Sequence, residues 1–346
     1  MLARPLFEEG QIHLMRAAAG LRRILAGPDL AIDLGTANTR LYAGDRGVVV
    51  EEPTAWNGQA QKVRRPETPW QELQSAPVQA CVVVDIEAAA ALLGPLIRRA
   101  RRVHLVRPRA LLCTPSDASE RERDALVETA HRAGASVLAV SPEPLAAALG
   151  AGLDPNSRFA SMIVDIGSGV TDIAVIRSGR IIHAAAIRMG CSDLRSAVSG
   201  MINVRHGVQL YLNEAERLMR EVGVQPGTVS PCMRLASGTG TDGSEAAVGV
   251  GDDEIRDAMA PVVSSILARI SRVLKDLPPV AACEVIEDGI CLTGGGACLR
   301  GMADLISKAT HLDVRVAPDP LRSVIYGAAL LLRQEASAVV PRYLLS

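Results

Sequence analysis

The chain has 346 residues, of which 48% are hydrophobic and 22% charged, and its formal net charge is -1. This length is enough for about two domains, and the balanced, apolar-rich composition excludes a largely disordered chain and one that binds nucleic acid over its whole surface. The seven cysteines form no CxxC pair, which is typical of reduced thiols in a cytosolic protein.

Residues 1–27 predict a basic amphipathic helix. At about 100° per residue, one narrow face collects Leu14, Ala18, Leu21 and Leu25. The segment 11–27 has three arginines and no acidic residue, which favours contact with an anionic membrane surface. Docking on its own domain or on a partner is the alternative. Because no segment has the roughly 18 apolar residues of a spanning helix, we expect a cytoplasmic protein that associates peripherally with the membrane.

The first chemical motif is a glycine turn between two apolar strands, one ending at Asp33 and one at residues 40–43. The turn consists of Gly35, Thr36, Ala37 and Asn38. Glycine lets backbone N–H groups approach an anion closely. Because Mg²⁺ prefers one or two carboxylates together with water and phosphate oxygens, Asp33 is well positioned to hold it. The motif therefore predicts one half of a clamp for a magnesium nucleotide.

A less regular stretch follows the strand predicted at 47–50. Residues 52–80 are polar and contain four prolines and both tryptophans, which predicts a small loop-rich insertion. A strand at 81–84 and a helix at 87–100 come next. Residues 98–109 carry six arginines and no acidic residue, which indicates a solvated helix end or a basic patch. No aromatic residue is interleaved for stacking on bases, so we expect no nucleic-acid partner.

The next elements alternate between strand and helix. Residues 110–115 predict a strand, and Ser119 with Glu122 forms a capping box for a helix that ends at Gly134. Another strand and a helix at 143–149 follow. This order indicates an α/β layer with a mixed sheet.

The glycine turn then returns 132 positions (165 minus 33) along the chain. A second aspartate opens it, and a second apolar strand follows it at 172–176. The residues of this turn are Asp165, Gly167, Ser168 and Gly169. The repeated hairpin suggests two similar domains that face each other across a cleft.

The second half of the chain adds a third glycine turn. Helices are predicted at 191–205, 213–222 and 253–277, with a glycine-rich insertion at 237–251. A strand at 290–293 then ends in three consecutive glycines, and a helix at 299–309 opens after Gly294, Gly295 and Gly296. A flat ligand or a phosphate can lie against such bare backbone at a helix N-terminus.

With these motifs in this order, the chain resembles the superfamily of actin, heat-shock chaperone ATPases and sugar kinases, and most closely the MreB-like bacterial actin homologues. The resemblance spans about residues 28–335 and is carried by 33–39, 52–54, 114–116, 143–153, the Asp165 turn, 292–297 and 299–301. It implies an α/β actin-like ATPase fold, in which two related mixed-sheet domains of the ribonuclease H type flank a nucleotide cleft. Domain I would comprise 28–158 and 318–346, with the short irregular insertion near 52–80. Domain II would comprise 159–317, with the glycine-rich insertion near 237–251.

By position, the resemblance implies ATP or ADP with Mg²⁺ in the cleft. Asp33 and Asp165 would flank the metal, mainly through water, with a turn-capping role as the alternative. Glu143 would position or activate the attacking water with Thr171 as a helper, and a surface acid at a helix N-terminus is the alternative for Glu143. The phosphates would lie against Gly35, Thr36, Ala37, Asn38, Gly167, Ser168 and Gly169. The adenosine would contact Gly294, Gly295, Gly296, Glu216 and Arg220.

Three functions follow as hypotheses. The first is an MreB-like cytoskeletal protein that binds Mg-ATP, hydrolyses it weakly and forms membrane-associated filaments involved in cell shape or envelope synthesis. Its partners would be copies of itself, an anionic membrane bound through residues 11–27, and cell-shape or envelope-synthesis proteins. Ser168, Val170 and Met219 stand where the family usually has glycine, threonine and lysine, which motivates the second hypothesis, a scaffold that binds nucleotide without turnover. A small-molecule kinase of the same superfamily is the third.

Overall fold

The computed structural model describes residues 29–44, 46–54, 76–100, 107–154, 156–225 and 232–337. The predicted N-terminal helix, most of the insertion near 52–80 and part of the arginine-rich stretch lie outside these residues. Within the described ranges, no helix is long and apolar enough to cross a bilayer.

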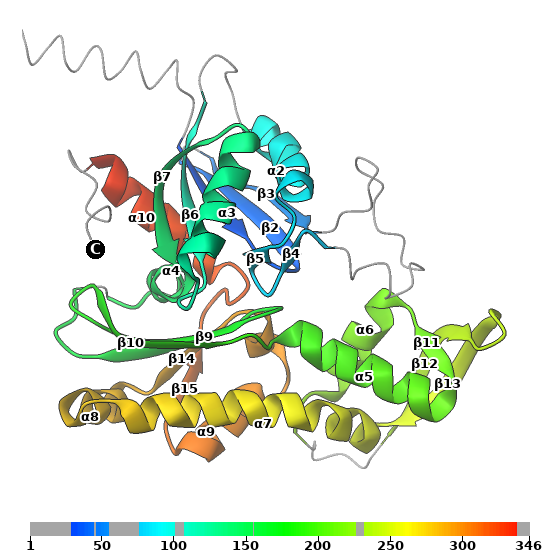
Figure 1. Cartoon of the computed structure of the whole chain (residues 1–346). Coiled ribbons are helices and arrows are strands. Elements are labelled where there is room, and N and C mark those ends of the chain that lie inside the picture. Colours follow the sequence, from blue (N-terminus) through cyan, green and yellow to red (C-terminus); the bar gives the residue numbers. More distant parts are fainter. Residues whose placement is uncertain are drawn as a thin grey trace, which may run out of the picture.

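The first domain is built on a five-stranded sheet with the order β3-β2-β1-β6-β7 (Figure 1). Its strands are β1 (Leu30–Leu34), β2 (Asn38–Ala43), β3 (Gly47–Pro53), β6 (Arg109–Thr114) and β7 (Ser136–Pro142). The strands β1, β2 and β3 pair antiparallel, whereas β6 runs parallel to β1 and β7. Helices α2 (Ile86–Ala100) and α3 (Glu120–Arg132) cover one face, and α3 begins with the predicted capping box of Ser119 and Glu122.

The second domain repeats this architecture with the sheet order β10-β9-β8-β14-β15. Its strands are β8 (Ser161–Ile166), β9 (Thr171–Arg177), β10 (Arg180–Ile187), β14 (Ile290–Thr293) and β15 (Val314–Val316). Strand directions match those of the first sheet, because β8, β9 and β10 pair antiparallel and β14 runs parallel to β8 and β15. The prediction of two related mixed-sheet domains is therefore confirmed.

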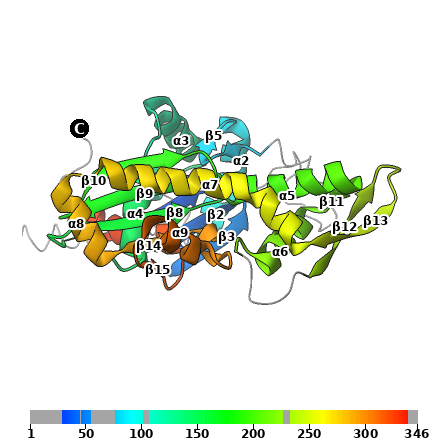
Figure 2. The same cartoon turned by 90° about the horizontal axis from the view of Figure 1, so that it is seen from below.

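A smaller three-stranded antiparallel sheet extends from the second domain (Figure 2). It consists of β11 (Val208–Leu210), β12 (Met233–Gly240) and β13 (Glu245–Gly251). The glycine-rich stretch predicted at 237–251 forms most of the β12–β13 hairpin, which the sequence analysis did not predict. A Cβ atom on Gly238 would stand 2.2 Å from the carbonyl oxygen of Gln209, so the glycine here permits close strand packing.

The helices of the second domain are α5 (Cys191–His206), α6 (Leu212–Val222), α7 (Asp252–Asp276), α8 (Pro279–Asp288) and α9 (Met302–Thr310). The long helix α7 runs along the second sheet (Figure 2). The helix predicted from residue 299 begins only at Met302. A short 3₁₀ turn at Gly295–Cys298 comes first, and Gly301 has a φ of 85°, a left-handed conformation that interrupts the helix.

The helices α4 (Glu143–Gly150) and α10 (Ser323–Ser337) join the two domains. Ala146 and Leu149 pack into the first domain together with α10, whereas Leu145 and Ala148 pack on β8 and β9. Two glycines allow the helices to cross in contact. A Cβ atom would stand 1.8 Å from the Ser323 carbonyl oxygen at Gly150, and 1.7 Å from the Ala146 carbonyl oxygen at Gly327. This crossing fixes the start of α4, and with it Glu143, between the two sheets.

Candidate functional site

The two predicted glycine turns have the same local geometry. The N–H of Gly35 donates to the carbonyl oxygen of Asn38 at 3.1 Å, and the N–H of Gly167 donates to that of Val170 at 2.9 Å. A Cβ atom on either glycine would stand about as close to that oxygen, at 3.0 Å and 2.9 Å. The tight turns therefore favour glycine, and both line one cavity between the domains.

The third glycine turn closes against the second. Gly294 has a φ of 82°, and a Cβ atom there would stand 2.4 Å from Oδ1 of Asp165. The cavity thus brings together residues from both domains that are far apart in the sequence. The predicted site residues that line it are Asp33, Gly35, Thr36, Ala37, Asn38, Glu143, Asp165, Gly167, Ser168, Glu216, Arg220, Gly294 and Gly295.

Three predicted site residues lie behind the cavity wall. A Cβ atom on Gly169 would stand 2.8 Å from Cα of Ala80, and one on Gly296 would meet the side chain of Ile166. Thr171 is fully buried, and its hydroxyl donates to the carbonyl oxygen of Met189 at 2.9 Å. Because that hydroxyl is already engaged away from the cavity, this geometry gives no support to Thr171 as a catalytic helper.

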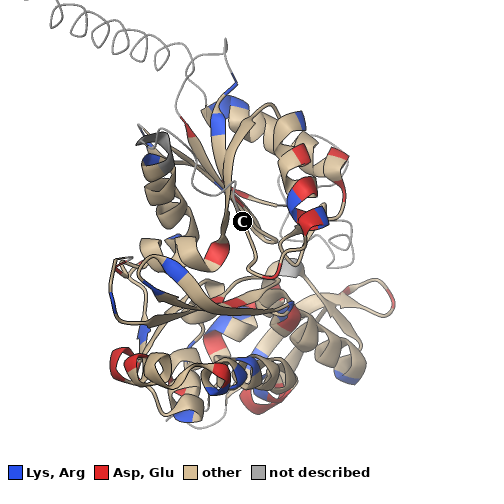
Figure 3. Cartoon of the chain, turned by 60° about the vertical axis from the view of Figure 1, so that its left-hand side comes forward, with Lys and Arg blue, Asp and Glu red and all other residues tan. Residues whose placement is uncertain are grey.

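Buried carboxylates gather around the cavity, and acidic positions lie where the two domains face each other (Figure 3). Burial raises the pKa of Asp165 to about 7, and the neighbouring Asp172 and Asp33 add to the effect. Burial raises the pKa of Glu143 well above its usual range, and the charges of Asp172, Asp33 and Asp165 raise it further. Burial also raises the pKa of Asp33, although Arg40 opposes it from 3.5 Å.

These carboxylates fit a hydrated magnesium ion bound with phosphate. In the part of the chain that the structure describes, no three His, Cys, Asp or Glu side chains could hold a metal ion by themselves. Mg²⁺ does not need such a cage, because it usually keeps several waters and takes one or two carboxylates plus phosphate oxygens. Asp33 and Asp165 end equivalent strands on opposite sides of the cavity. Burial is the main cause of their raised pKa values, so a bound cation would stabilise their charged forms.

The sequence interpretation missed Asp172, which lies directly across the β8–β9 ladder from Asp165. The equivalent position in the first domain is Arg40, opposite Asp33, and both residues come seven positions after their aspartate. Asp172 is buried, and its Oδ1 accepts hydrogen bonds from the N–H and the hydroxyl of Ser116 in the first domain. The seven-residue spacing was the signal that could have found it.

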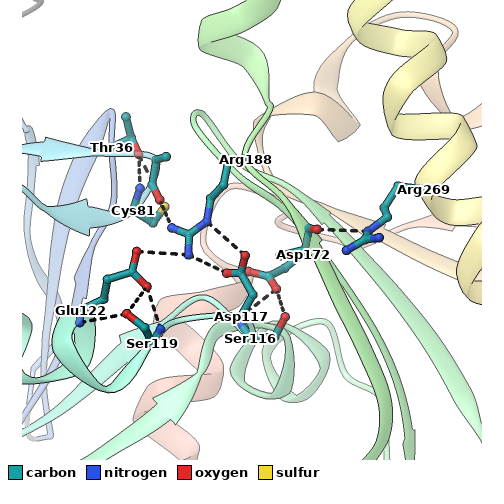
Figure 4. A network of polar contacts seen from close by, with 11 residues as sticks. Thr36, Cys81, Ser116, Asp117, Ser119, Glu122, Asp172, Arg188 and Arg269 are labelled. Atoms are coloured by element: carbon teal, nitrogen blue, oxygen red, sulfur yellow. Dashed lines mark hydrogen bonds and ion pairs between the residues drawn. The ribbon is translucent and has the colours of Figure 1, made fainter.

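A polar network connects the domains beside these turns (Figure 4). Arg188 follows β10, donates to the carbonyl oxygen of Ala80 at 2.8 Å and pairs with Asp117 at 2.7 Å. Ala80 and Cys81 form the tip of the small hairpin of β4 (Val78–Gln79) and β5 (Val82–Val83), with φ angles of 46° and 57°. The N–H of Cys81 donates to the hydroxyl of Thr36 at 2.8 Å. This strained tip therefore connects the first glycine turn to the second domain.

The comparisons with known proteins agree with this geometry. The family model described as MreB/Mbl protein matches residues 27–339. The chain belongs to the MreB/Mbl family. One relative within it, the cell shape-determining protein MreB of Escherichia coli (strain K12), is 31% identical over 322 residues, which cover 88% of this chain and 93% of that protein.

Solved structures extend the MreB/Mbl assignment to the fold. The crystal structure of MreB 5 of Spiroplasma citri bound to AMPPNP aligns with a TM-score of 0.78 and 26% identity, covering 89% of this chain and 96% of that one. A double helical filament of MamK aligns with a TM-score of 0.72 and 20% identity over 88% of this chain and 99% of that one, a likeness that shows the fold alone. The predictions of an MreB-like chain and an actin-like fold are confirmed.

Proposed function

We propose that this MreB/Mbl family member binds ATP with Mg²⁺ in the cavity between its domains and assembles into membrane-associated filaments that take part in cell shape determination or envelope synthesis. The observation that carries the proposal is one cavity lined by two matching glycine turns, a third glycine turn and three buried carboxylates, Asp33, Glu143 and Asp165. The AMPPNP bound to the Spiroplasma citri relative is consistent with a nucleotide in this position.

Each part of the cavity has a separate task in this proposal. The N–H groups of the two turns would bind the phosphates, and the charge of Asp33 and Asp165 would hold Mg²⁺ and its waters. When bound there, Mg²⁺ would supply positive charge to neutralise the charge that develops on the transferred phosphoryl group. Glu143 is the buried first residue of α4, and in this proposal its carboxylate would position a water molecule beside the phosphates.

Glu143 distinguishes an ATPase from a scaffold that binds nucleotide without turnover. If Glu143 activates the attacking water, Glu143→Ala should lower the rate of phosphate release about a hundredfold while Mg-ATP still binds. The rate is measured with a coupled phosphate assay, with Glu128→Ala on the exposed face of α3 as the control. Equal, background-level rates in wild type and Glu143→Ala would favour the scaffold.

Self-assembly and membrane attachment are tested together. Purified full-length chain with Mg-ATP should pellet and show filaments by electron microscopy, and anionic vesicles should recruit them. Deleting residues 1–27 should abolish recruitment to vesicles and leave nucleotide binding intact. The absence of any polymer, with and without vesicles, would refute the filament proposal. Retained recruitment after the deletion would move the membrane contact elsewhere in the chain.

A further inference from the structure

One end of the cavity is lined by side chains of helices α5 and α6. Glu216 on α6 is contacted there by two arginines. Arg220, one turn further along α6, pairs with it at 2.6 Å, and Arg195 on α5 approaches it at 3.7 Å. All three side chains line the cavity. Each oxygen of the Glu216 carboxylate thus has one guanidinium neighbour and keeps a further lone pair for a polar ligand group.

The two arginines differ strongly in exposure. The side chain of Arg220 is 63% exposed, whereas that of Arg195 is only 16% exposed. Arg195 also lies near the thiol of Cys191, another cavity residue. Burial raises the pKa of Cys191 to about 12, and Arg195 opposes this rise. Arg195 is thus the more buried of the two cations at this end, where a charge contact with a ligand is screened least by water.

Apolar side chains in the cavity lining suit a flat ring. Met219, Leu299 and Val324 supply aliphatic surface, and the described residues that line the cavity include no phenylalanine, tyrosine or tryptophan. A nucleobase bound here would lack an aromatic partner for stacking. A guanidinium group is planar, weakly hydrated and able to stack on an aromatic ring, so Arg195 offers the surface that the other wall residues do not.

We propose that Arg195 is a specificity-determining residue of the nucleoside half of the site, with its guanidinium against the purine base while its pairing with Glu216 orients that carboxylate toward the ribose. The inference rests on the proposed function, because it requires a nucleotide whose phosphates lie at the glycine turns. Met219 on α6 carries no charge, so Arg195 on α5 would supply the cation beside the base.

The experiment compares two ligands that share phosphates but not a nucleoside. Arg195→Met should weaken Mg-ATP binding about tenfold or more, because a desolvated cation–π contact is lost. The affinity for magnesium tripolyphosphate, measured by competition with labelled ATP, should stay at the wild-type value. Arg195→Lys, which keeps the charge but not the planar group, should lie between wild type and Arg195→Met.

Arg205→Met is the matched control, because Arg205 lies on the same helix, outside the cavity lining, in an exposed ion pair with Glu254. It should bind both ligands as the wild type does. An unchanged ATP affinity in Arg195→Met would overturn the inference, and so would an equal loss for ATP and tripolyphosphate. A melting temperature of the ligand-free variant well below that of Arg205→Met would assign Arg195 a structural role instead. Wild-type protein that binds neither ligand would refute the proposed function itself.

Discussion

Replacing Asp165 with asparagine is expected to stabilise the ligand-free protein at pH 8 and to weaken Mg-ATP binding about a hundredfold. Asp165 has a pKa of about 7 because burial and nearby aspartates disfavour its charged form. At pH 8 the folded protein must keep that charge buried, and the neutral amide removes a cost of up to about 4 kcal/mol. The same amide lacks the charge that attracts Mg²⁺. Thermal unfolding and calorimetric titration measure the two effects.

The pH dependence of the free energy of unfolding provides a second test of the raised pKa of Asp165. A carboxyl whose pKa is raised on folding contributes stability below its ordinary pKa of 3.8 and loses it as the pH rises through about 7. The ligand-free wild type should therefore become less stable between pH 5 and pH 8, and Asp165→Asn should reduce that slope. Asp276→Asn, in an exposed ion pair on α7, is the control and should change neither property. Unchanged Mg-ATP affinity in Asp165→Asn would remove Asp165 from the metal site.

Replacing Gly150 with valine is expected to cost about 3 kcal/mol or more of the free energy of unfolding. The first carbon of any side chain there would stand 1.8 Å from the Ser323 carbonyl oxygen, which is backbone of the crossing helix and cannot rotate away. The helix α4 cannot shift either, because it is buried against both domains. Since natural domains have only about 5–15 kcal/mol of stability, much of the fold should be lost. Denaturant unfolding followed by circular dichroism measures the change.

Gly200→Ala on α5 is the matched control, since it is also a helical glycine but has no atom within 4 Å of the added carbon. Alanine there should stabilise the protein by up to about 1 kcal/mol. If Gly150→Val were as stable as the wild type, the close crossing of α4 and α10 would be incorrect.

Local patterns predicted most of the fold because each glycine turn and its apolar strands form a self-contained hairpin. The β8–β9 hairpin follows from the Asp165 turn, and α4 follows from its terminal residues. The hairpin of β12 and β13 was missed because its glycines resemble a loop. Gly238 is instead required by the backbone of a neighbouring strand, which is a tertiary contact that one segment does not reveal.

Local sequence patterns likewise predicted some residues of the candidate site and not others. The three glycine turns and Glu143 could be recognised because each lies beside its own strand or helix end. Arg188 could not, since its partner Asp117 comes from the opposite domain. Asp172 could have been found from its seven-residue spacing after Asp165, but its contact with Ser116 of the opposite domain could not. The helper role of Thr171 came from the family resemblance, and its hydroxyl donates to the carbonyl oxygen of Met189, a contact that the sequence does not reveal.

Titration of the full-length wild-type chain with ATP, with Mg²⁺ and with the metal chelated, tests the central claim most directly. We expect saturable binding at a single site per chain, a clear loss of affinity when the metal is removed, and competition by ADP. No saturable binding of ATP in the presence of Mg²⁺, or an affinity that chelation leaves unchanged, would contradict a magnesium nucleotide held between Asp33, Asp165 and the glycine turns.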